Sequence, residues 1–458
     1  MTTITKAISS TGNRKIFTVS VWLKRANGVS GGNGGIFGVG TAASDSGKFV
    51  LRFDTNNKLK VASGASTWRV SDAAFTDQFA WYHIVCAVDS TDPTADNRIR
   101  AWVNGEQITV WGTNNTMSQD QNTPVNDVGQ THYINSDGGG GDLFKGYFAH
   151  FHLTDGTAYP PTTFGEVDST SGIWKPKTSP SVTYGTNGVF LEFENSGNMG
   201  LDSSGQTNNY TIGSAGTNPQ TTDTPANNFS VLNPYNRRQT NNAPNYAHGN
   251  LFIDNQDQDT QGNNWCSTLG GLTKGKWYCE ITPTVNGSAT GNMNLGVIAT
   301  QMSMNNGNAA SGSQTGYSYF YTANGNKGVS DGSTSSITSS SYGNTYTTDD
   351  IIGIFLDLDN GTLKFSKNGT IQNSGTAAFT DLKTNMDYSG YMFGGGIGTA
   401  GAGNQNQIKG ANFGNPPGTI SISSSQADAN GFGNFEYTPN DGSYNYYALC
   451  TKNLQEFN

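Results

Sequence analysis

Two carboxylates in the first half of the chain have a spacing that could serve hydrolysis. Glu166 and Asp168 are separated by one residue, so on a β-strand they would lie on the same face. Cleavage of a glycosidic bond requires two carboxyl groups that flank the bond, and E-x-D-x-x-E would supply such a set. Ser171 occupies the last acidic position here, and prolines flank the segment. The pattern therefore predicts a loop without a catalytic set, and we expect that the protein is not an enzyme.

Two further acidic pairs are interpreted as structural. Glu192 and Glu194 are one strand period apart and are expected on the solvent face of a strand. Asp357 and Asp359 lead into a turn, which Asp side chains stabilise by local hydrogen bonds. No Gly-x-Ser-x-Gly motif occurs, and the glycines at 138–141 lack the Lys-Ser/Thr of a phosphate-binding loop. These patterns predict neither a nucleophilic site nor a nucleotide site.

Metal-binding residue types occur without a complete ligand set. Asp254, Asp257 and Asp259 could attract calcium, but their spacing is not D-x-D-x-D-G and a bidentate acid is missing at the expected distance. His150 and His152 share a strand face without a third ligand at a convincing spacing for zinc. We therefore predict no metal site and no cofactor. Whether a calcium ion is bound at the end of a loop stays open.

The aromatic residues beside long polar loops are the candidate ligand contacts. Trp111 and Tyr133 flank the loop 112–132, and Tyr342 and Tyr346 lie in the loop before a strong hairpin pattern. Aromatic faces together with amide and hydroxyl side chains bind sugars and protein surfaces, although local packing is the alternative role for each ring. The tryptophans within strand patterns are assigned to cores or sheet faces, namely Trp22, Trp81, Trp102 and Trp277.

Composition narrows the classes of partner. The 458 residues carry a net charge of −9, and only 13% are charged. Nucleic acid or an anionic membrane would require basic patches, so neither is expected as a partner. The start of the chain resembles no signal peptide, and no stretch of about 18 apolar residues occurs, so we expect synthesis in a cytosol without membrane insertion. The four cysteines lack a CxxC pair and are interpreted as buried thiols: Cys86, Cys266, Cys279 and Cys450.

Alternating apolar residues predict a first β-sandwich over residues 1–195. The segment 17–25 alternates apolar and polar residues, as in a half-buried strand, and the nearly continuous apolar segment 80–90 is typical of a central strand. The segment 99–111 holds Asn104-Gly105 between two strand patterns, which is a strong hairpin signal. Strands recurring at about 8–12 residues are the pattern of a sandwich.

The rest of the chain predicts a linker, a second sandwich and a tail. Residues 196–245 are rich in Ser, Asn, Thr, Gly and Pro and are expected to form a long linker, in part ordered against one module. Residues 246–415 again show strand patterns, with hairpin turns at Asn360-Gly361 and Asn368-Gly369. Residues 416–458 are expected to be a polar tail whose final apolar stretch docks as a strand. The predicted fold class is therefore all-β, with two β-sandwich (jelly-roll) domains joined by a long polar linker.

Longer sequence phrases resemble two known families. Residues 13–177, with NRKIFTVSVWLKR and GYFAHFHLTDGTAYPPTTFGEVDSTSGIWKPK, resemble the laminin-G-like, concanavalin-type jelly roll, in the version common in structural proteins of marine tailed phages. Residues 275–415, with GKWYCEITP, IIGIFLDLDNGTLKFSKNGT and ANFG, resemble the SPRY (B30.2-like) β-sandwich. The phrases DTPANNFSVLNPY and YYALCTKNL are similar to the phage arrangement, in which the two modules occur in this order.

The resemblance implies a virion protein made in the host cytoplasm. Such a protein is a tail fibre or another surface component of a bacteriophage, and it binds a host-surface glycan or other virion proteins of the tail or capsid. The jelly roll starts almost at once, which leaves room for the alternative of a capsid-decorating or assembly protein without a receptor role. A polysaccharide-degrading enzyme is the third alternative. A homo-oligomer would have to rest on sandwich surfaces or on the symmetry of the particle, because no coiled-coil pattern occurs.

Overall fold

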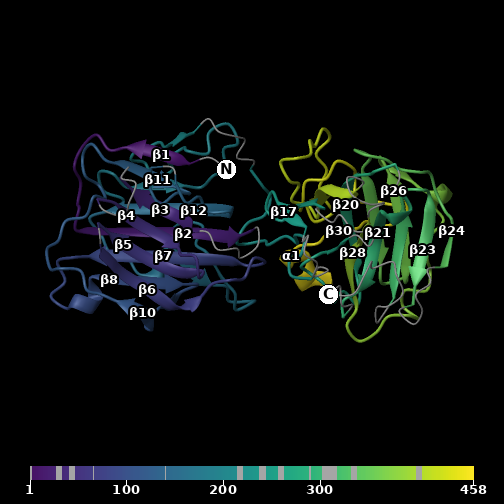
Figure 1. Ribbon diagram of the computed structural model, residues 1–458, viewed down its shortest axis with the longest axis horizontal. Helices are drawn as coiled ribbons and strands as arrows, with labels where there is room; N and C mark the ends of the chain where they lie inside the picture. The colour runs from purple at the N-terminus through teal and green to yellow at the C-terminus, as the bar shows by residue number, and fades with distance from the viewer. Residues whose placement is uncertain are drawn as a thin grey trace. The chain divides into compact units, whose positions relative to one another are not determined.

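The computed structural model divides the chain into two compact units, Met1–Gln220 and Thr221–Asn458. Each unit is described by itself. The residues that the structure describes are 3–26, 33–40, 47–64, 66–139, 141–213, 220–236, 244–255, 263–287, 290–301, 317–331, 338–398 and 405–457. Both units consist of β-sheets, and the expected all-β fold with two β-sandwich domains is confirmed (Figure 1). Among the described residues, no helix is long and apolar enough to cross a membrane.

The first unit contains two large antiparallel sheets. The eight-stranded sheet has the order β10 (Trp111–Asn114), β6 (Ser66–Ala74), β5 (Lys58–Ser63), β4 (Phe49–Phe53), β3 (Gly34–Val39), β11 (Thr131–Ile134), β1 (Ile4–Ala7) and β16 (Thr211–Ile212). The six-stranded sheet has the order β15 (Val189–Leu191), β12 (Gly146–Asp155), β2 (Ile16–Arg25), β7 (Trp81–Asp89), β8 (Ile99–Val103) and β9 (Glu106–Gln107). Short elements complete the unit: β13 (Gly165–Val167), β14 (Trp174–Pro176), and the 3-10 turns η1 (Ala95–Asn97) and η2 (Pro161–Thr163).

Alternation along the strands places one apolar face of each sheet in a common core. On β2, Phe17, Val19, Val21 and Leu23 are fully buried in this core, and on β4 Phe49 packs edge-on against Phe17 with ring centroids 5.3 Å apart. The period of two residues therefore predicted the inward-facing set of β2 correctly. The tryptophans at 22, 81, 102 and 277 are buried, and the four cysteines are buried free thiols, as expected.

The segment 196–245 differs from the expected linker, because its described residues belong to the two units. Tyr210 is 3% exposed in the first core, and its hydroxyl lies 3.2 Å from His132 Nδ1. β16 pairs with β1, with Ile212 opposite Ile4. Further along, Phe229 packs in the second unit. A few apolar anchors thus fasten a segment whose polar composition resembles that of a linker.

The second unit also contains two large sheets. One has the order β17 (Asn245–Ala247), β18 (Phe252–Asp254), β29 (Gln407–Asn412), β20 (Lys276–Thr284), β25 (Ile352–Asp357), β26 (Thr362–Lys367) and β27 (Thr370–Ile371), with β30 (Tyr447–Ala448) paired in parallel to β20. The other has the order β19 (Asn263–Cys266), β28 (Tyr391–Ile397), β21 (Asn294–Ala299), β22 (Ser318–Thr322), β23 (Asn326–Ser330) and β24 (Thr338–Ser341). The remaining elements are η3 (Thr290–Asn292), η4 (Asn373–Gly375) and α1 (Thr451–Phe457).

The predicted asparagine–glycine hairpins are present in both units. Asn104-Gly105 connects β8 to β9 with φ angles of 51° and 86°, and Asn368-Gly369 connects β26 to β27 with φ angles of 47° and 78°. Two successive positive φ angles are the requirement of a type I′ turn, which asparagine and glycine tolerate best. Asn360-Gly361 lies in a longer connection between β25 and β26, where only Gly361 has a positive φ, of 71°.

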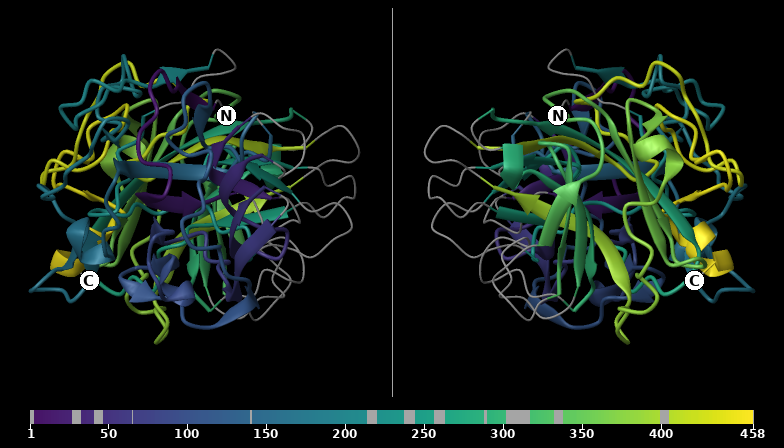
Figure 2. Two further views of the ribbon diagram at one scale, coloured as in Figure 1. Left: turned by 90° about the vertical axis from the view of Figure 1, so that its left-hand side faces the viewer. Right: turned by 90° about the vertical axis from the view of Figure 1, so that its right-hand side faces the viewer.

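The C-terminal segment of the second unit forms an additional layer on the larger sheet. Tyr278 and Phe355 project from the face of this sheet turned away from the sandwich core, and they pack in one cluster with Phe435 and Tyr446. In both views of Figure 2 the segment is drawn in yellow outside the strands of this unit. The expected polar tail is thus packed against the sheet, because its few apolar residues cover this second face.

A buried carboxylate fastens the layer to the sheet. Glu280 on β20 is 1% exposed and accepts hydrogen bonds from the backbone N–H groups of Glu436, at 3.0 Å, and Tyr437, at 2.8 Å. It also accepts from the Tyr278 hydroxyl at 3.0 Å and from Asn412 Nδ2 at 3.2 Å. A buried carboxylate is tolerated only when its oxygens are satisfied in this way. Glu280 therefore determines where the segment meets the sheet.

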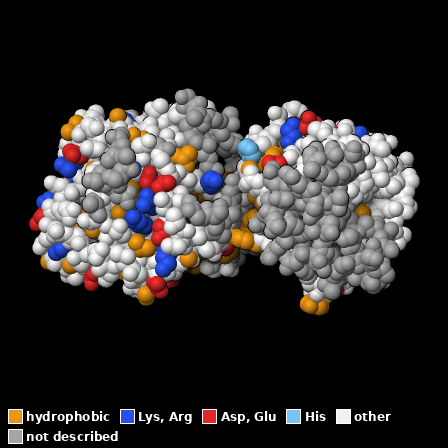
Figure 3. Space-filling model, in the orientation of Figure 1, with side chains coloured by type: hydrophobic (Ala, Val, Ile, Leu, Met, Phe, Trp, Pro, Cys, Tyr) orange, Lys and Arg blue, Asp and Glu red, His pale blue; other side chains and the backbone are white. Residues whose placement is uncertain are grey.

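Charged side chains are few and mixed in sign on the surface. On the face drawn in Figure 3, Lys and Arg side chains lie beside Asp and Glu side chains, and most described side chains are neither. Some of these charges form ion pairs, for example Arg14 with Asp127 at 3.1 Å and Lys409 with Asp349 at 2.5 Å. Neighbouring charges of opposite sign reduce the long-range field of the protein.

Replacing Glu280 with Gln should destabilise the second unit. The variant keeps the size of the side chain but replaces an oxygen, which can accept a hydrogen bond in the carboxylate and in the neutral carboxyl alike, with an NH2 group that can only donate and faces a donor. We expect the free energy of unfolding to fall by about 1–3 kcal/mol, measured at pH 5 by hydrogen exchange in β20. Glu456→Gln makes the same change on an exposed carboxylate and should stay within about 0.5 kcal/mol of wild type. Equal losses in both variants would contradict the role of Glu280.

The cost of Glu280→Gln should also depend on pH. Burial raises the pKa of Glu280 to about 7 from 4.5, although the four hydrogen bonds act in the opposite direction. The folded state therefore holds the proton more tightly than the unfolded state does. The stability that Glu280 contributes is fully present below the unfolded-state pKa of 4.5, and it is lost as the pH rises through the folded-state pKa of about 7. The difference in unfolding free energy between wild type and variant should shrink across this window. A difference that grows with pH would overturn the assignment.

Candidate binding site

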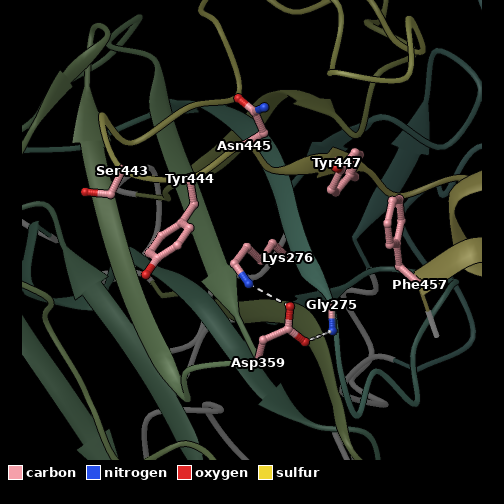
Figure 4. A pocket seen from close by; sticks show the side chains of 8 residues that line it. All are labelled: Gly275, Lys276, Asp359, Ser443, Tyr444, Asn445, Tyr447 and Phe457. Carbon is pink, nitrogen blue, oxygen red and sulfur yellow. Dashed lines mark hydrogen bonds and ion pairs between the residues drawn. The ribbon is translucent and has the colours of Figure 1, made fainter.

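A cavity of about 420 Å³ lies in the second unit beside the start of β20 (Figure 4). Its size falls within the range of about 300–1,000 Å³ that is usual for small-molecule sites. The lining residues come from the sheet, from a turn and from the C-terminal layer: Gly275, Lys276, Asp359, Ser443, Tyr444, Asn445, Tyr447 and Phe457. Segments far apart in the sequence thus build the cavity together.

Two of the lining residues, Lys276 and Asp359, form a charged triad with Asp357. Lys276 Nζ is 2.6 Å from Asp359 Oδ2 and 3.3 Å from Asp357 Oδ1. Asp359 Oδ1 also accepts the backbone N–H of Gly275 at 2.8 Å. Figure 4 shows the Lys276 side chain reaching Asp359 between the aromatic rings. The cation therefore lies between two carboxylates and is not presented alone to a ligand.

The environment keeps this ion pair charged at neutral pH. Burial lowers the pKa of Lys276, but the hydrogen bond to Asp359 and the charge of Asp357 outweigh burial, so its pKa is raised above the usual value. Burial acts to raise the pKa of Asp359, but the bonds from Lys276 and Gly275 outweigh it and hold the pKa below its usual value. Neither group is a proton donor or acceptor of the kind that catalysis near neutral pH requires.

One aspartate shapes the loop that carries three of the lining residues. Asp441 Oδ1 accepts the backbone N–H groups of Ser443 and Tyr444 at 2.9 and 2.8 Å. Its Oδ2 accepts from Lys364 Nζ on β26 at 2.7 Å and from the Tyr446 hydroxyl at 3.1 Å. Burial raises the pKa of Asp441, but Lys364 and the two N–H groups hold it below its usual value. The loop is therefore fixed to the sheet before any ligand arrives.

Aromatic rings form the walls of the cavity. Tyr447 on β30 and Phe457 on α1 are stacked, with ring centroids 4.1 Å apart and planes inclined by 28°. Tyr444 is 47% exposed, and Lys276 Nζ lies 5.1 Å from the centre of its ring. Such rings offer flat apolar surface at a small entropic cost because each has only two rotatable bonds.

The four aromatic candidates from the sequence do not form one site. Trp111 on β10 and Tyr133 on β11 are half-buried, and four strands lie between them in the sheet. The Arg69 guanidinium lies 5.7 Å from the centre of the Trp111 ring, and this ring packs against the first core. Tyr342 and Tyr346 belong to the second unit, so the two pairs lie in different units.

Tyr342 and Tyr346 are core residues and not surface contacts. They are 6% and 2% exposed, and both rings lie against Tyr321. The Tyr346 hydroxyl donates to a backbone carbonyl at 2.9 Å, and the Tyr342 hydroxyl to another at 3.3 Å. Burial raises the pKa of Tyr342 to about 12. The two tyrosines belong to a segment that is polar in sequence, but their side chains point inward. A ligand therefore cannot reach them.

The acidic residues considered for catalysis are engaged in local structure. Asp168 Oδ2 is 2.7 Å from Lys175 Nζ, and Asp168 Oδ1 accepts the backbone N–H of Ser171. These hydrogen bonds hold the pKa of Asp168 below the usual range. Glu166 lies 3.9 Å from the same Lys175. Asp357 accepts the backbone N–H of Asn360 at 2.9 Å, as expected for a turn. The position of Asp359 at the cavity was not predicted.

The histidines of the first unit are built into its packing. His152 is stacked on Phe190, with centroids 4.0 Å apart, and His150 lies in a bulge of β12 with a φ of 46°. Asp254 accepts from Gln407 Nε2 at 2.6 Å, whereas Asp257 and Asp259 lie outside the described residues. In the part of the chain that the structure describes, no three His, Cys, Asp or Glu side chains are grouped to hold a metal ion.

Sequence reasoning missed the cavity, although one signal was available. Three tyrosines occur within four residues at 444, 446 and 447, with Asn445 between them. Only one of the three, Tyr446, is fully buried, and the others face the cavity. An aromatic run that is only partly needed for packing is therefore a useful indicator of a contact surface.

Replacing Asp441 with Ala should loosen the loop without unfolding the unit. The variant removes the acceptor of two backbone N–H groups and the partner of Lys364, so we expect a loss of about 1–3 kcal/mol in stability. Amide exchange at Ser443 and Tyr444 should accelerate at least about tenfold. Asp381→Ala removes an exposed carboxylate and serves as the control. Unchanged exchange at both amides would exclude Asp441 as the residue that fixes the loop.

Family comparisons match one domain in each unit. The model of the Concanavalin A-like lectin/glucanases superfamily (laminin G type) matches residues 3–160, and the SPRY domain model matches residues 276–391. The search of curated proteins gave no match.

Solved structures with low sequence identity are also similar. The SPRY domain of human HERC1 is 13% identical, with a TM-score of 0.27 over 42% of this chain and 99% of that one. A heptameric SAP-like pentraxin from Limulus polyphemus is 15% identical, with a TM-score of 0.28 over 46% of this chain and 88% of that one. The CBM40 of a Ruminococcus gnavus IT-sialidase, bound to α2,3-sialyllactose, is 13% identical, with a TM-score of 0.23 over 31% of this chain and 86% of that one.

Proposed function

We propose that this chain, in which a concanavalin A-like (laminin G) jelly roll is followed by a SPRY domain, is a non-enzymatic surface protein of a bacteriophage virion. It attaches to a host-surface glycan or to neighbouring virion proteins of the tail or capsid. The observation that carries the binding role is the cavity at the start of β20, which combines aromatic walls with hydroxyl and amide groups. A pre-formed cavity of this kind is suited to holding a ligand.

Attachment is favoured over hydrolysis by the state of the carboxylates. A glycosidase needs one carboxyl group that gives up a proton and one that stays ionised beside the bond. Asp168 is held ionised by Lys175 and by local donors, and Glu166 shares the same lysine. At the cavity, Asp359 is also held ionised by its lysine. These carboxylates are arranged to stabilise turns and ion pairs.

The virion location rests on the resemblance to proteins of marine tailed phages. The order of the two modules and the phrase DTPANNFSVLNPY are typical of that arrangement. The SPRY domain supports contact with neighbouring virion proteins, because such modules serve as protein-interaction domains, and the lectin-like jelly roll supports contact with a glycan. A tail fibre fits this role, and so does another surface component of the particle.

Particles that lack the protein should remain intact but adsorb poorly. We expect the rate of adsorption to host cells to fall at least about tenfold, because the attachment contacts are lost, while electron microscopy shows complete particles. Purified protein should compete for adsorption and should release no reducing ends from host envelope polysaccharide. Malformed particles would indicate an assembly or decoration role instead. Release of reducing ends would contradict the non-enzymatic assignment.

A further inference from the structure

We infer that the cavity beside β20 is a glycan site that takes one ring of a neutral sugar. This inference rests on the proposed attachment function and names the ligand class and the module that binds it. It assigns the glycan to the C-terminal unit and not to the lectin-like jelly roll. Four independent features of the described residues support it: the paired charges, the unpartnered uncharged groups, the aromatic walls and the covered face of the jelly roll.

The one cation among the described residues that line the cavity is already paired within the protein, and its two carboxylates leave the group with a formal charge of −1. Lys276 is held by Asp359 at 2.6 Å and by Asp357 at 3.3 Å, so an anionic ligand would have to compete with two carboxylates. A cationic ligand would meet Lys276 beside the exposed carboxylate. An anionic group would therefore have to displace one of these carboxylates from Lys276. A ligand without charge avoids this cost.

Uncharged polar groups remain available around the opening. Among the described residues, no hydrogen-bond partner is found for the hydroxyls of Ser443, Tyr444 and Tyr447. Asn445 Oδ1 accepts from Asn440 Nδ2 at 2.6 Å, which leaves the Asn445 amide NH2 as a donor. Hydroxyls donate and accept, and the amide donates. Such a set matches the hydroxyl groups of a sugar, which also do both.

The stacked rings of Tyr447 and Phe457 provide an apolar wall beside these groups. A sugar ring carries hydroxyls at its edge and C–H groups on its faces, so it can place a face against an aromatic ring while its edge forms hydrogen bonds. Asp359 is about half exposed and has lone pairs left to accept from a sugar hydroxyl. The loop held by Asp441 fixes this arrangement in advance, which lowers the entropic cost of binding.

The broad outer face of the six-stranded sheet in the jelly roll is covered by its own chain. Phe164 packs on Val85, Ala87 and Trp102, and Trp174 Nε1 donates to His83 Nδ1 at 3.0 Å. A ligand on this part of the face would have to displace the segment that carries these contacts. The described residues thus leave the cavity of the second unit as the better-prepared site.

Tyr447→Ala and Asn445→Ala test the assignment on the full chain. Wild type and variants would be titrated against neutral hexose and N-acetylhexosamine oligosaccharides on an array, and a bound oligosaccharide would be measured by calorimetry. We expect each variant to lose at least about tenfold in affinity, and raised ionic strength to change wild-type affinity by less than about twofold. Tyr388→Ala removes a tyrosine that is 91% exposed and outside the cavity, and it should bind like wild type. Unchanged melting temperatures would confirm that the variants are folded.

The failures of this inference and of the proposed function are distinguishable. Glycan binding that survives both cavity variants would place the site elsewhere and overturn the inference, while attachment stands. Binding that weakens steeply with salt would identify a charged ligand and overturn it as well. If no neutral oligosaccharide binds but the cavity variants lose binding to virion protein, the cavity serves a protein partner. Loss of the protein without any effect on adsorption would instead contradict the proposed function.

Discussion

The second unit depends on burying the outer, largely aromatic face of its larger sheet. Glu280 stands on that face, and its carboxylate is satisfied only because the C-terminal layer supplies two backbone N–H groups. Without the layer, the carboxylate would be solvated and Tyr278 and Phe355 would be exposed. The layer is therefore part of the domain's stability and not an appendage. The same layer pairs with the start of β20 and supplies five of the eight residues that line the cavity, so the cavity also depends on it.

Two carboxylates hold the layer by different electrostatic means. The four groups that donate to Glu280 are all neutral, and burial dominates its pKa. Asp441 is held ionised by Lys364 and by the N–H groups of its own loop. The first fixes the layer to the middle of β20, whereas the second fixes the loop next to the cavity. A rigid sheet and a rigid loop together give a cavity whose lining does not have to reorganise on binding.

The architecture could be predicted from the sequence, but the site could not. The period of two residues in β2 and the Asn104-Gly105 turn are local signals, and they predicted the core-facing residues and the hairpin correctly. The expectation of a half-buried strand was wrong, because β2 is buried on both faces. The cavity depends on pairing between β20 and β30, which are more than 150 residues apart, and no local pattern reports such a contact. The prediction that Tyr342 and Tyr346 contact a ligand was wrong for a related reason. A loop can turn its aromatic residues inward when the sheet below offers space.

In both units, side chains that could carry a free positive charge are either neutral or paired. In the first unit, Trp174 Nε1 can only donate, so His83 Nδ1 accepts and its Nε2–H donates to Ser20 at 2.8 Å. Burial, aided by His150, lowers the pKa of His83 to about 3, so the ring is neutral. In the second unit Lys276 is enclosed by carboxylates. At the glycan site that we propose, recognition would depend on hydrogen-bond geometry and shape, and not on long-range attraction. Its affinity would therefore change little with ionic strength.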